Sequence, residues 1–171
     1  MKERYKSFFQ RLNALDTGNR AALRRSAGVM LGEADGNAVT AFFRVLPAWV
    51  PEEQTERWFA AACLRCLWDA GQESEAPLEK LIGYAMRSGE LSDSMAHRVE
   101  VLMDTEWASD GFLLTKLTRL VKLLQRKTEM IPDVSQLLED LLYWNGDKQT
   151  VQRRWARTIF TADEAETGKE S

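Results

Sequence analysis

The chain has 171 residues, of which 44% are hydrophobic and 29% charged, enough apolar material for one domain or two small ones. No run of about 18 uncharged apolar residues occurs, so a membrane-spanning helix is excluded, and the amino terminus lacks the apolar stretch of a signal peptide. Two cysteines are too few for a disulfide framework, so we expect a soluble protein of the reducing cytoplasm. The net charge of −3, taken as a total, argues against a general nucleic-acid binder.

Amphipathic stretches with apolar residues three and four apart dominate the chain, and no segment alternates long enough to predict a strand. Gly28, Gly32 and Gly36 mark a loop, Pro51 suits the first turn of a long helix, and Gly71 is its expected stop. The expected helices cover residues 2–15, 20–26, 37–46, 51–70, 77–88, 92–104, 109–127, 133–144 and 147–161. The sequence therefore predicts an all-α protein of about nine helices.

These helices are expected to form two small bundles. The loop at residues 89–93 is the candidate boundary, because glycine and serine interrupt the helical pattern there. Residues 1–90 would form an amino-terminal helical bundle and residues 91–163 a carboxy-terminal bundle, followed by a frayed, acidic tail at residues 164–171.

Residues that usually carry catalysis are scarce. Metal-dependent phosphoesterases need clustered histidines and carboxylates, whereas this chain has one histidine, His97, which we interpret as an ordinary surface or boundary residue. No glycine-rich loop followed by Lys-Ser or Lys-Thr occurs, which excludes the usual nucleotide phosphate site. We expect no enzymatic activity, no metal site and no cofactor.

Cys63 and Cys66 have the Cys-x-x-Cys spacing of redox and zinc motifs, but they lie in AAACLRCLW, a helix interior without a preceding strand or a second pair. We therefore expect both to be buried packing residues, and a thiol nucleophile is the remaining enzymatic alternative. Most of the six tryptophans are expected to be core or interface anchors rather than base-stacking groups, because each has apolar neighbours. The six tryptophans of the chain are Trp49, Trp58, Trp68, Trp107, Trp144 and Trp155.

The distribution of charge is more informative than its total. Residues 1–32 carry seven basic and two acidic side chains, residues 33–110 carry six and fifteen, and residues 111–128 carry five and none. Residues 129–171 carry five basic and nine acidic side chains. Two basic segments thus accompany an acidic body, a pattern that can direct a polyanion to one face of the protein.

The helix at residues 111–127 is the strongest functional signal in the sequence. At about 100° per residue, Leu113, Leu117, Leu120, Val121 and Leu124 gather on one side. The cations of this segment fall on an adjoining arc of roughly 140°, with no acidic residue between Asp110 and Glu129. These cations are Lys116, Arg119, Lys122, Arg126 and Lys127. The pattern favours contact with a polyanion, because solvated helix faces normally mix both signs of charge.

Several strings follow one another along the chain: LDTGNRAALRRS, AFFRVLP, AMRSGELS leading into HRVEVLM, LTKLTRLVKLL, and LLYWNGDKQTVQRRWARTIF. In this order they resemble the CasB family, the small subunit of the type I-E CRISPR surveillance complex called Cascade. An amphipathic helix precedes the first of them, so the resemblance covers most of the chain.

The resemblance implies a non-catalytic, all-helical subunit present as a head-to-tail pair in a guide-RNA complex. Its implied partners are the backbone and large subunits of Cascade, the guide crRNA and the target DNA, chiefly the displaced strand, so that the R-loop is stabilised. The arginines that match the family's pattern are Arg24, Arg25, Arg44, Arg98 and Arg119. The charge pattern adds Arg87, Lys116, Lys122 and Arg126.

One alternative from another class is left open by the residues alone. A helical adaptor could use the same arginine stripes to contact acidic protein surfaces and never touch nucleic acid. Binding to DNA of any sequence that weakens steeply with salt would favour the nucleic-acid hypothesis.

Overall fold

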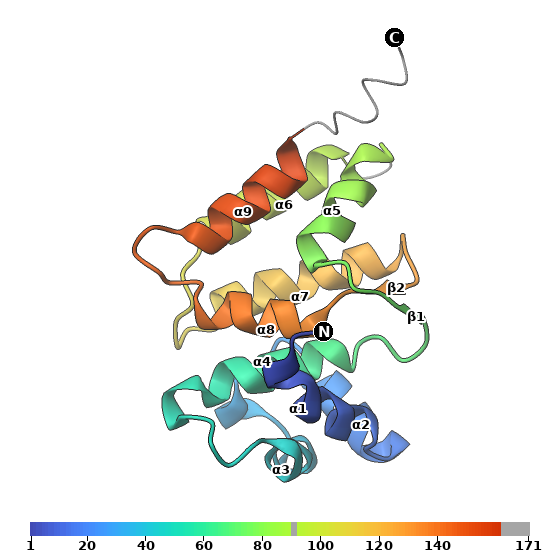
Figure 1. Cartoon of the computed structure of the whole chain (residues 1–171), viewed down its shortest axis with the longest axis vertical. Coiled ribbons are helices and arrows are strands. Elements are labelled where there is room, and N and C mark those ends of the chain that lie inside the picture. Colours follow the sequence, from blue (N-terminus) through green and yellow to red (C-terminus); the bar gives the residue numbers. More distant parts are fainter. Residues whose placement is uncertain (90–91, 162–171) are drawn as a thin grey trace.

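The structure, a computed structural model, describes residues 1–89 and 92–161 (Figure 1). Within these residues the chain forms nine α-helices, which confirms the predicted all-α class. They are α1 (Glu3–Asn13), α2 (Thr17–Arg25), α3 (Gly36–Val45), α4 (Thr55–Arg65), α5 (Leu78–Arg87), α6 (Ser92–Met103), α7 (Phe112–Gln125), α8 (Val134–Leu142) and α9 (Thr150–Phe160). Short 3₁₀ turns, η1 (Leu31–Glu33) and η2 (Glu52–Gln54), precede α3 and α4.

The long helix expected at residues 51–70 is shorter in the structure. Pro51 precedes the 3₁₀ turn η2, and α4 ends at Arg65 rather than near Gly71. The backbone then tightens, because the amides of Leu67 and Trp68 bond to carbonyls three residues earlier. Arg65 fixes this turn by donating from Nη1 to the Trp68 carbonyl oxygen at 2.8 Å.

A short parallel pair of strands, β1 (Gln72–Glu73) and β2 (Met130–Ile131), joins two segments that lie between the expected helices. Gln72 pairs with Met130 and Glu73 with Ile131. Gly71 has a specific role here, since a Cβ at this position would lie 2.4 Å from the carbonyl oxygen of Glu129. Each strand has only two residues, too few for an alternating pattern to be visible in the sequence.

The helices pack around a continuous apolar core. At one end, α1, α2 and α3 lie around α4, which packs on α8 and α7 in the middle of the molecule (Figure 1). At the other end, α5 packs on α9 and α6. The division into two bundles stays a prediction, since its boundary at residues 90 and 91 and the tail at 164–171 lie outside the described residues.

Two aromatic clusters occupy the ends of this core. Trp58 meets the rings of Tyr5 and Phe8 edge-on at centroid distances of 5.4 and 5.0 Å, and Trp144 meets Trp155 at 5.4 Å. The expectation of mostly buried tryptophans is confirmed, because Trp58, Trp68, Trp144 and Trp155 are buried and Trp107 is partly buried. Trp49 is the exception, being 51% exposed at the edge of the first cluster, where its ring centroid lies 5.5 Å from that of Trp58.

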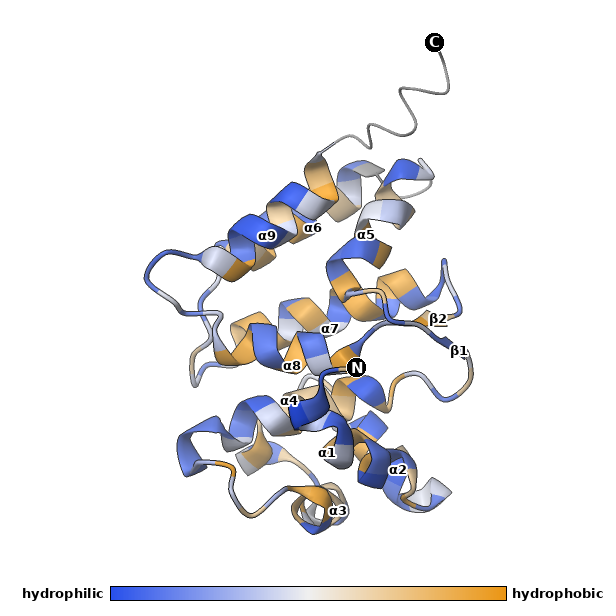
Figure 2. Cartoon of the chain, in the orientation of Figure 1, coloured by the Kyte–Doolittle hydropathy of each residue, from blue (hydrophilic) through white to orange (hydrophobic). Residues whose placement is uncertain are grey.

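A polar network holds α9 to its neighbours, although the visible face of α9 is largely hydrophilic (Figure 2). Asp140 of α8 is buried and accepts hydrogen bonds from Arg154 and from the Trp155 indole. Arg154 also donates from Nε to Glu79 of α5 at 3.2 Å. One half-exposed guanidinium thus pairs with two buried carboxylates.

Candidate nucleic-acid interface

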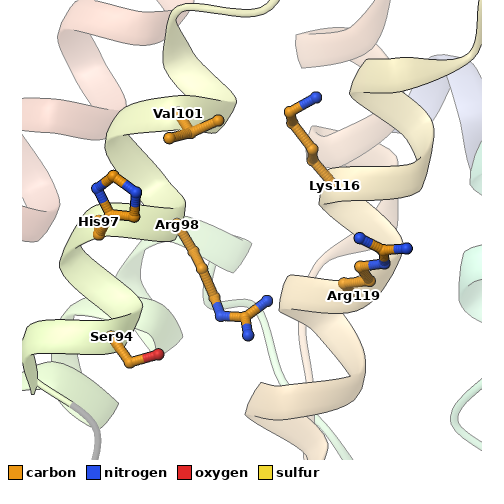
Figure 3. Close-up of a pocket in the computed structure, with 6 residues that line it drawn as sticks. All are labelled: Ser94, His97, Arg98, Val101, Lys116 and Arg119. Carbon is orange, nitrogen blue, oxygen red and sulfur yellow. The ribbon is translucent and has the colours of Figure 1, made fainter.

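A groove of about 330 Å³ lies between α6 and α7 (Figure 3). Its lining comes from four residues of α6 and two of α7, namely Ser94, His97, Arg98 and Val101 with Lys116 and Arg119. Arg98 extends from α6 toward α7, and Lys116 and Arg119 stand on the facing helix (Figure 3). Three permanent cations and one imidazole therefore border the same space.

The sequence of α6 explains why these residues share a face. Positions 94, 97, 98 and 101 follow the three- and four-residue spacing of one helix face. On the other face Met95, Val99 and Leu102 are fully buried and hold α6 on the core. His97 and Arg98 are exposed, so the interpretation of His97 as a surface residue is confirmed, although it lies within the groove.

The predicted amphipathic pattern of α7 is also confirmed. The predicted apolar stripe is buried against the core, whereas Lys116 is half-buried and Arg119 is exposed beside it. The stripe consists of Leu113, Leu117, Leu120, Val121 and Leu124. Burial of the apolar stripe fixes the rotation of α7, so the adjoining cations face the groove.

The groove cations lack carboxylate partners in the part of the chain that the structure describes. No ion pair joins Arg98, Lys116 or Arg119 to an acidic residue there. Lys116 instead approaches an aromatic ring, since its Nζ lies 5.2 Å from the ring centroid of Phe112, one turn earlier in α7. These cations are thus free to pair with an anion that enters the groove.

Lys122 and Arg126, the other two predicted residues of this segment, are exposed but do not line the groove. Arg126 caps the carboxyl end of α7, because the helix ends at Gln125 rather than at residue 127. Both cations could extend the basic surface along the helix axis.

Arg24 and Arg25 lie at the end of α2, in the other half of the molecule. Arg24 Nη1 is 3.1 Å from Asp69, and Arg25 Nη2 is 3.8 Å from Asp35. Surface pairs of this kind are weak, about 0 to 1 kcal/mol, so an external anion can compete for these guanidiniums.

Arg44 and Arg87 stand apart from the groove. Arg44 is exposed in the last turn of α3, beside the half-exposed ring of Phe43. Arg87 ends α5, and its guanidinium lies 5.2 Å from the ring centroid of Tyr84. Of the nine predicted residues, three therefore line the groove, and the other six lie outside it.

Sequence reasoning missed Ser94 and His97 as groove residues and assigned no role to Phe112. The helical spacing of Ser94 and His97 with Arg98 was visible in the sequence, but nothing local indicated that this face of α6 would meet α7. Phe112 is 58% exposed, which the sequence did not indicate.

Both cysteines are buried in α4 and the turn that follows it, in agreement with the packing role that we predicted. Burial raises the pKa of the Cys63 thiol well above its ordinary value, and burial raises the pKa of Cys66 to about 11. Neither thiol is an accessible thiolate at neutral pH, which disfavours the nucleophile alternative.

The described residues form neither a metal-binding cluster nor a membrane-spanning helix. Over residues 1–89 and 92–161, no three His, Cys, Asp or Glu side chains are grouped so that they could hold a metal ion. Within the same ranges, none of the helices has the length and apolar character needed to cross a membrane.

Fold and groove together define a class: a small helical protein that presents a cationic groove between two helices. The family model of CRISPR-associated protein Cse2 matches residues 19–160. The chain therefore belongs to the Cse2 family.

Known relatives agree with this assignment. A CRISPR-associated protein Cse2 from Thermus thermophilus is 27% identical over 98% of this chain and 94% of its own length. The crystal structure of a Cse2-family protein from the same species is 28% identical, with a TM-score of 0.74 over 94% of this chain and 97% of that one.

Two more distant structures share the fold. CasB from M. ruber is 21% identical with a TM-score of 0.74, and a chain of a CRISPR RNA-guided surveillance complex is 22% identical with a TM-score of 0.75. Each comparison covers 99% of this chain and 98% of the other.

Proposed function

We propose that this protein is the non-catalytic small subunit of a type I-E Cascade complex and contacts the phosphate backbone of the displaced target strand. The observation that carries the proposal is the groove between α6 and α7, which Arg98, Lys116 and Arg119 line together and whose described lining contains no carboxylate. Guanidinium and ammonium groups bind phosphates through charge-assisted hydrogen bonds and counterion release, neither of which requires a particular base.

Such contacts suffice for a role in R-loop formation. Exchanging a DNA strand for a guide RNA is nearly balanced in free energy, so a few phosphate contacts to the displaced strand shift the equilibrium toward the open state. The acidic remainder of the surface repels DNA elsewhere and favours one orientation. No step of this role needs a reactive side chain.

The implied partners are the backbone and large subunits, the guide crRNA, the target DNA and a second copy of this chain in head-to-tail order. Support comes from family membership and from the relative whose structure is described as a CRISPR RNA-guided surveillance complex. We propose a cytoplasmic location, where such a complex would meet invading DNA.

The adaptor alternative also has an observation in its favour. Arg24 and Arg25 already contact carboxylates of their own chain, Asp69 and Asp35. These arginines could equally meet acidic surfaces of another subunit, so the experiment must separate loss of DNA binding from loss of assembly.

The test is a triple variant with Arg98→Ala, Lys116→Ala and Arg119→Ala, measured for binding to single-stranded oligonucleotides over a range of salt concentrations. The slope of log affinity against log salt should fall by roughly 2 to 3 units, because each lost phosphate contact contributes about 0.7 to 0.9. The loss should be similar for unrelated sequences. The matched control replaces Lys6, Arg11 and Lys148, three exposed cations outside the groove.

A second triple variant separates the groove from the helix face. Replacing Lys116, Arg119 and Lys122 removes the same number of charges but leaves Arg98 in the groove. Its effect on the salt slope should be smaller than that of the groove variant if strand and groove meet as proposed. In the assembled complex, the R-loop should become less stable while guide-RNA retention changes little. If the groove variant folds and assembles but its salt slope is unchanged, the proposed contact with DNA is wrong and the adaptor function is favoured.

A further inference from the structure

Phe112 is an exposed aromatic residue at the start of α7, in line with the groove cations. Its side chain is 58% exposed, more than those of Phe43 and Phe160, which are 50% and 44% exposed. One face of its ring is approached by Lys116, whose Nζ lies 5.2 Å from the ring centroid. More than half of this apolar side chain is in contact with water, so the ring is accessible to a ligand.

The geometry of α7 puts Phe112 on the same face as Lys116 and Arg119. At 100° per residue, positions 112, 116 and 119 lie within an arc of about 60°. The axial rise from position 112 to position 119 is about 10 Å, so the ring and the two cations form a row along the helix.

The first turn of α7 holds this ring in place. Gly111 precedes the helix with a φ of 73°, and the Phe112 amide donates to Asp110 Oδ1 at 3.0 Å. Thr115 Oγ1 adds a hydrogen bond of 3.0 Å to the Gly111 carbonyl. The aromatic ring is therefore carried by a fixed helix end rather than by a flexible loop.

We propose that Phe112 is a stacking platform for an unpaired base of the strand whose phosphates the groove binds. This inference rests on the proposed function and adds to it a positioning residue that acts on bases rather than phosphates. Binding of single strands combines a cationic path for the backbone with exposed aromatic rings on which bases stack in any sequence. A base pair in a duplex has no free face to offer, so the ring would favour single strands over duplexes.

Tyr84 is another exposed aromatic residue with cations beside it, and it fits this role less well. Its ring has Lys80 at 5.9 Å and Arg87 at 5.2 Å, and it lies at a separate groove lined by Met130 and Lys127. Among the described residues Lys116 is the one cation over the ring of Phe112, and that ring is 58% exposed and so accessible to a base.

The experiment compares a single-stranded oligothymidylate with an abasic oligomer of the same length, which keeps the phosphates but has no bases. The variants are Phe112→Ala, Phe112→Leu, which keeps apolar volume, and Phe112→Tyr, which keeps an aromatic face. Phe160→Ala, on a helix that does not line the groove, is the control.

The unsubstituted protein should prefer the oligothymidylate. Phe112→Ala should lose about 5- to 150-fold in affinity for it and little for the abasic strand. Phe112→Leu should behave like Phe112→Ala, whereas Phe112→Tyr and Phe160→Ala should bind nearly as the unsubstituted protein does. The salt slope should not change, because no phosphate contact is removed.

The outcomes separate the two proposals. Equal affinity of the unsubstituted protein for both strands, or full binding by Phe112→Leu, overturns the stacking role and leaves the phosphate groove intact. Weakened assembly with unchanged DNA binding would make Phe112 a protein contact and also overturns it. Absence of any binding by the unsubstituted protein, alone and in the assembled complex, overturns the proposed function and the inference together.

Discussion

The indole N–H of Trp155 donates a 2.9 Å hydrogen bond to Oδ2 of Asp140, inside the interface between α8 and α9. The other oxygen of Asp140 accepts from Gln136 Nε2 at 2.8 Å and from Arg154. A buried carboxylate with three donors fixes both the rotation and the height of α9 on the core.

Replacing Asp140 with Ala should lower the free energy of unfolding by about 2 to 3 kcal/mol, because the buried Trp155 N–H loses its acceptor and Arg154 loses a counter-charge. Urea unfolding followed by circular dichroism measures the change. Asp147→Ala, in the exposed turn before α9, is the control and should stay within about 0.5 kcal/mol of the parent. A similar loss for both variants would mean that the network contributes nothing specific.

Glu79 should make stability depend on pH. Burial raises the pKa of its carboxyl above the ordinary value, and this outweighs the opposing attraction of Arg154. A carboxyl whose folded pKa is raised contributes stability below its unfolded pKa and loses it as the pH rises through the folded pKa. As the pH rises through and above the ordinary titration range of a glutamate, stability should therefore shift in favour of Glu79→Gln relative to the parent. Glu75→Gln, at an exposed position, should show no such trend.

Gly71→Ala should destabilise the protein by about 1 to 3 kcal/mol, since the new methyl group must displace the Glu129 carbonyl or strain the backbone. The loss would appear as a lower midpoint in thermal unfolding. Gly32→Ala is a matched comparison, because a Cβ there meets no atom within 4 Å. Equal stability of the two variants would contradict the close approach of β1 and β2.

The two thiols should react slowly with an alkylating reagent in the native protein at mildly alkaline pH. Both are buried, and the raised pKa of each keeps it protonated. Complete reaction is expected once the chain is unfolded in denaturant, as mass spectrometry would record. The double variant Cys63→Ser and Cys66→Ser should retain DNA binding if it folds, and a specific loss of binding would revive a functional role for the thiols.

How far the sequence predicts the structure depends on whether a feature is local. The buried stripe of α7 and its flanking cations Lys116 and Arg119 follow from helical periodicity alone, and the structure agrees with that pattern. Arg98 was found through family resemblance, because its helix carries no comparable run of cations. That α6 and α7 lie side by side depends on the packing of Val99 and Leu102 into the common core, which no local pattern encodes.

Other features could not be predicted because they depend on contacts between residues distant in sequence, which local patterns do not encode. The early end of α4 depends on the turn that Arg65 makes with the Trp68 carbonyl, and the role of Gly71 depends on Glu129, far along the chain. The exposure of Phe112 and the position of His97 in the groove depend on which surfaces remain uncovered once every helix has packed. The sequence thus predicts the elements and one face of the site, while the groove itself emerges only from the assembled core.

The two edge-on tryptophan pairs provide intrinsic spectroscopic signals that report on unfolding at two places in the protein. Trp49 and Trp58 report from the end that holds α1 to α4, and Trp144 and Trp155 report from the contact of α8 with α9. Closely spaced indoles couple their electronic transitions, so each pair should contribute its own ultraviolet circular dichroism signal. Single substitutions of Trp49 and of Trp144 by Phe would assign the two signals, and their loss in one step or in two would tell whether the ends of the molecule unfold together.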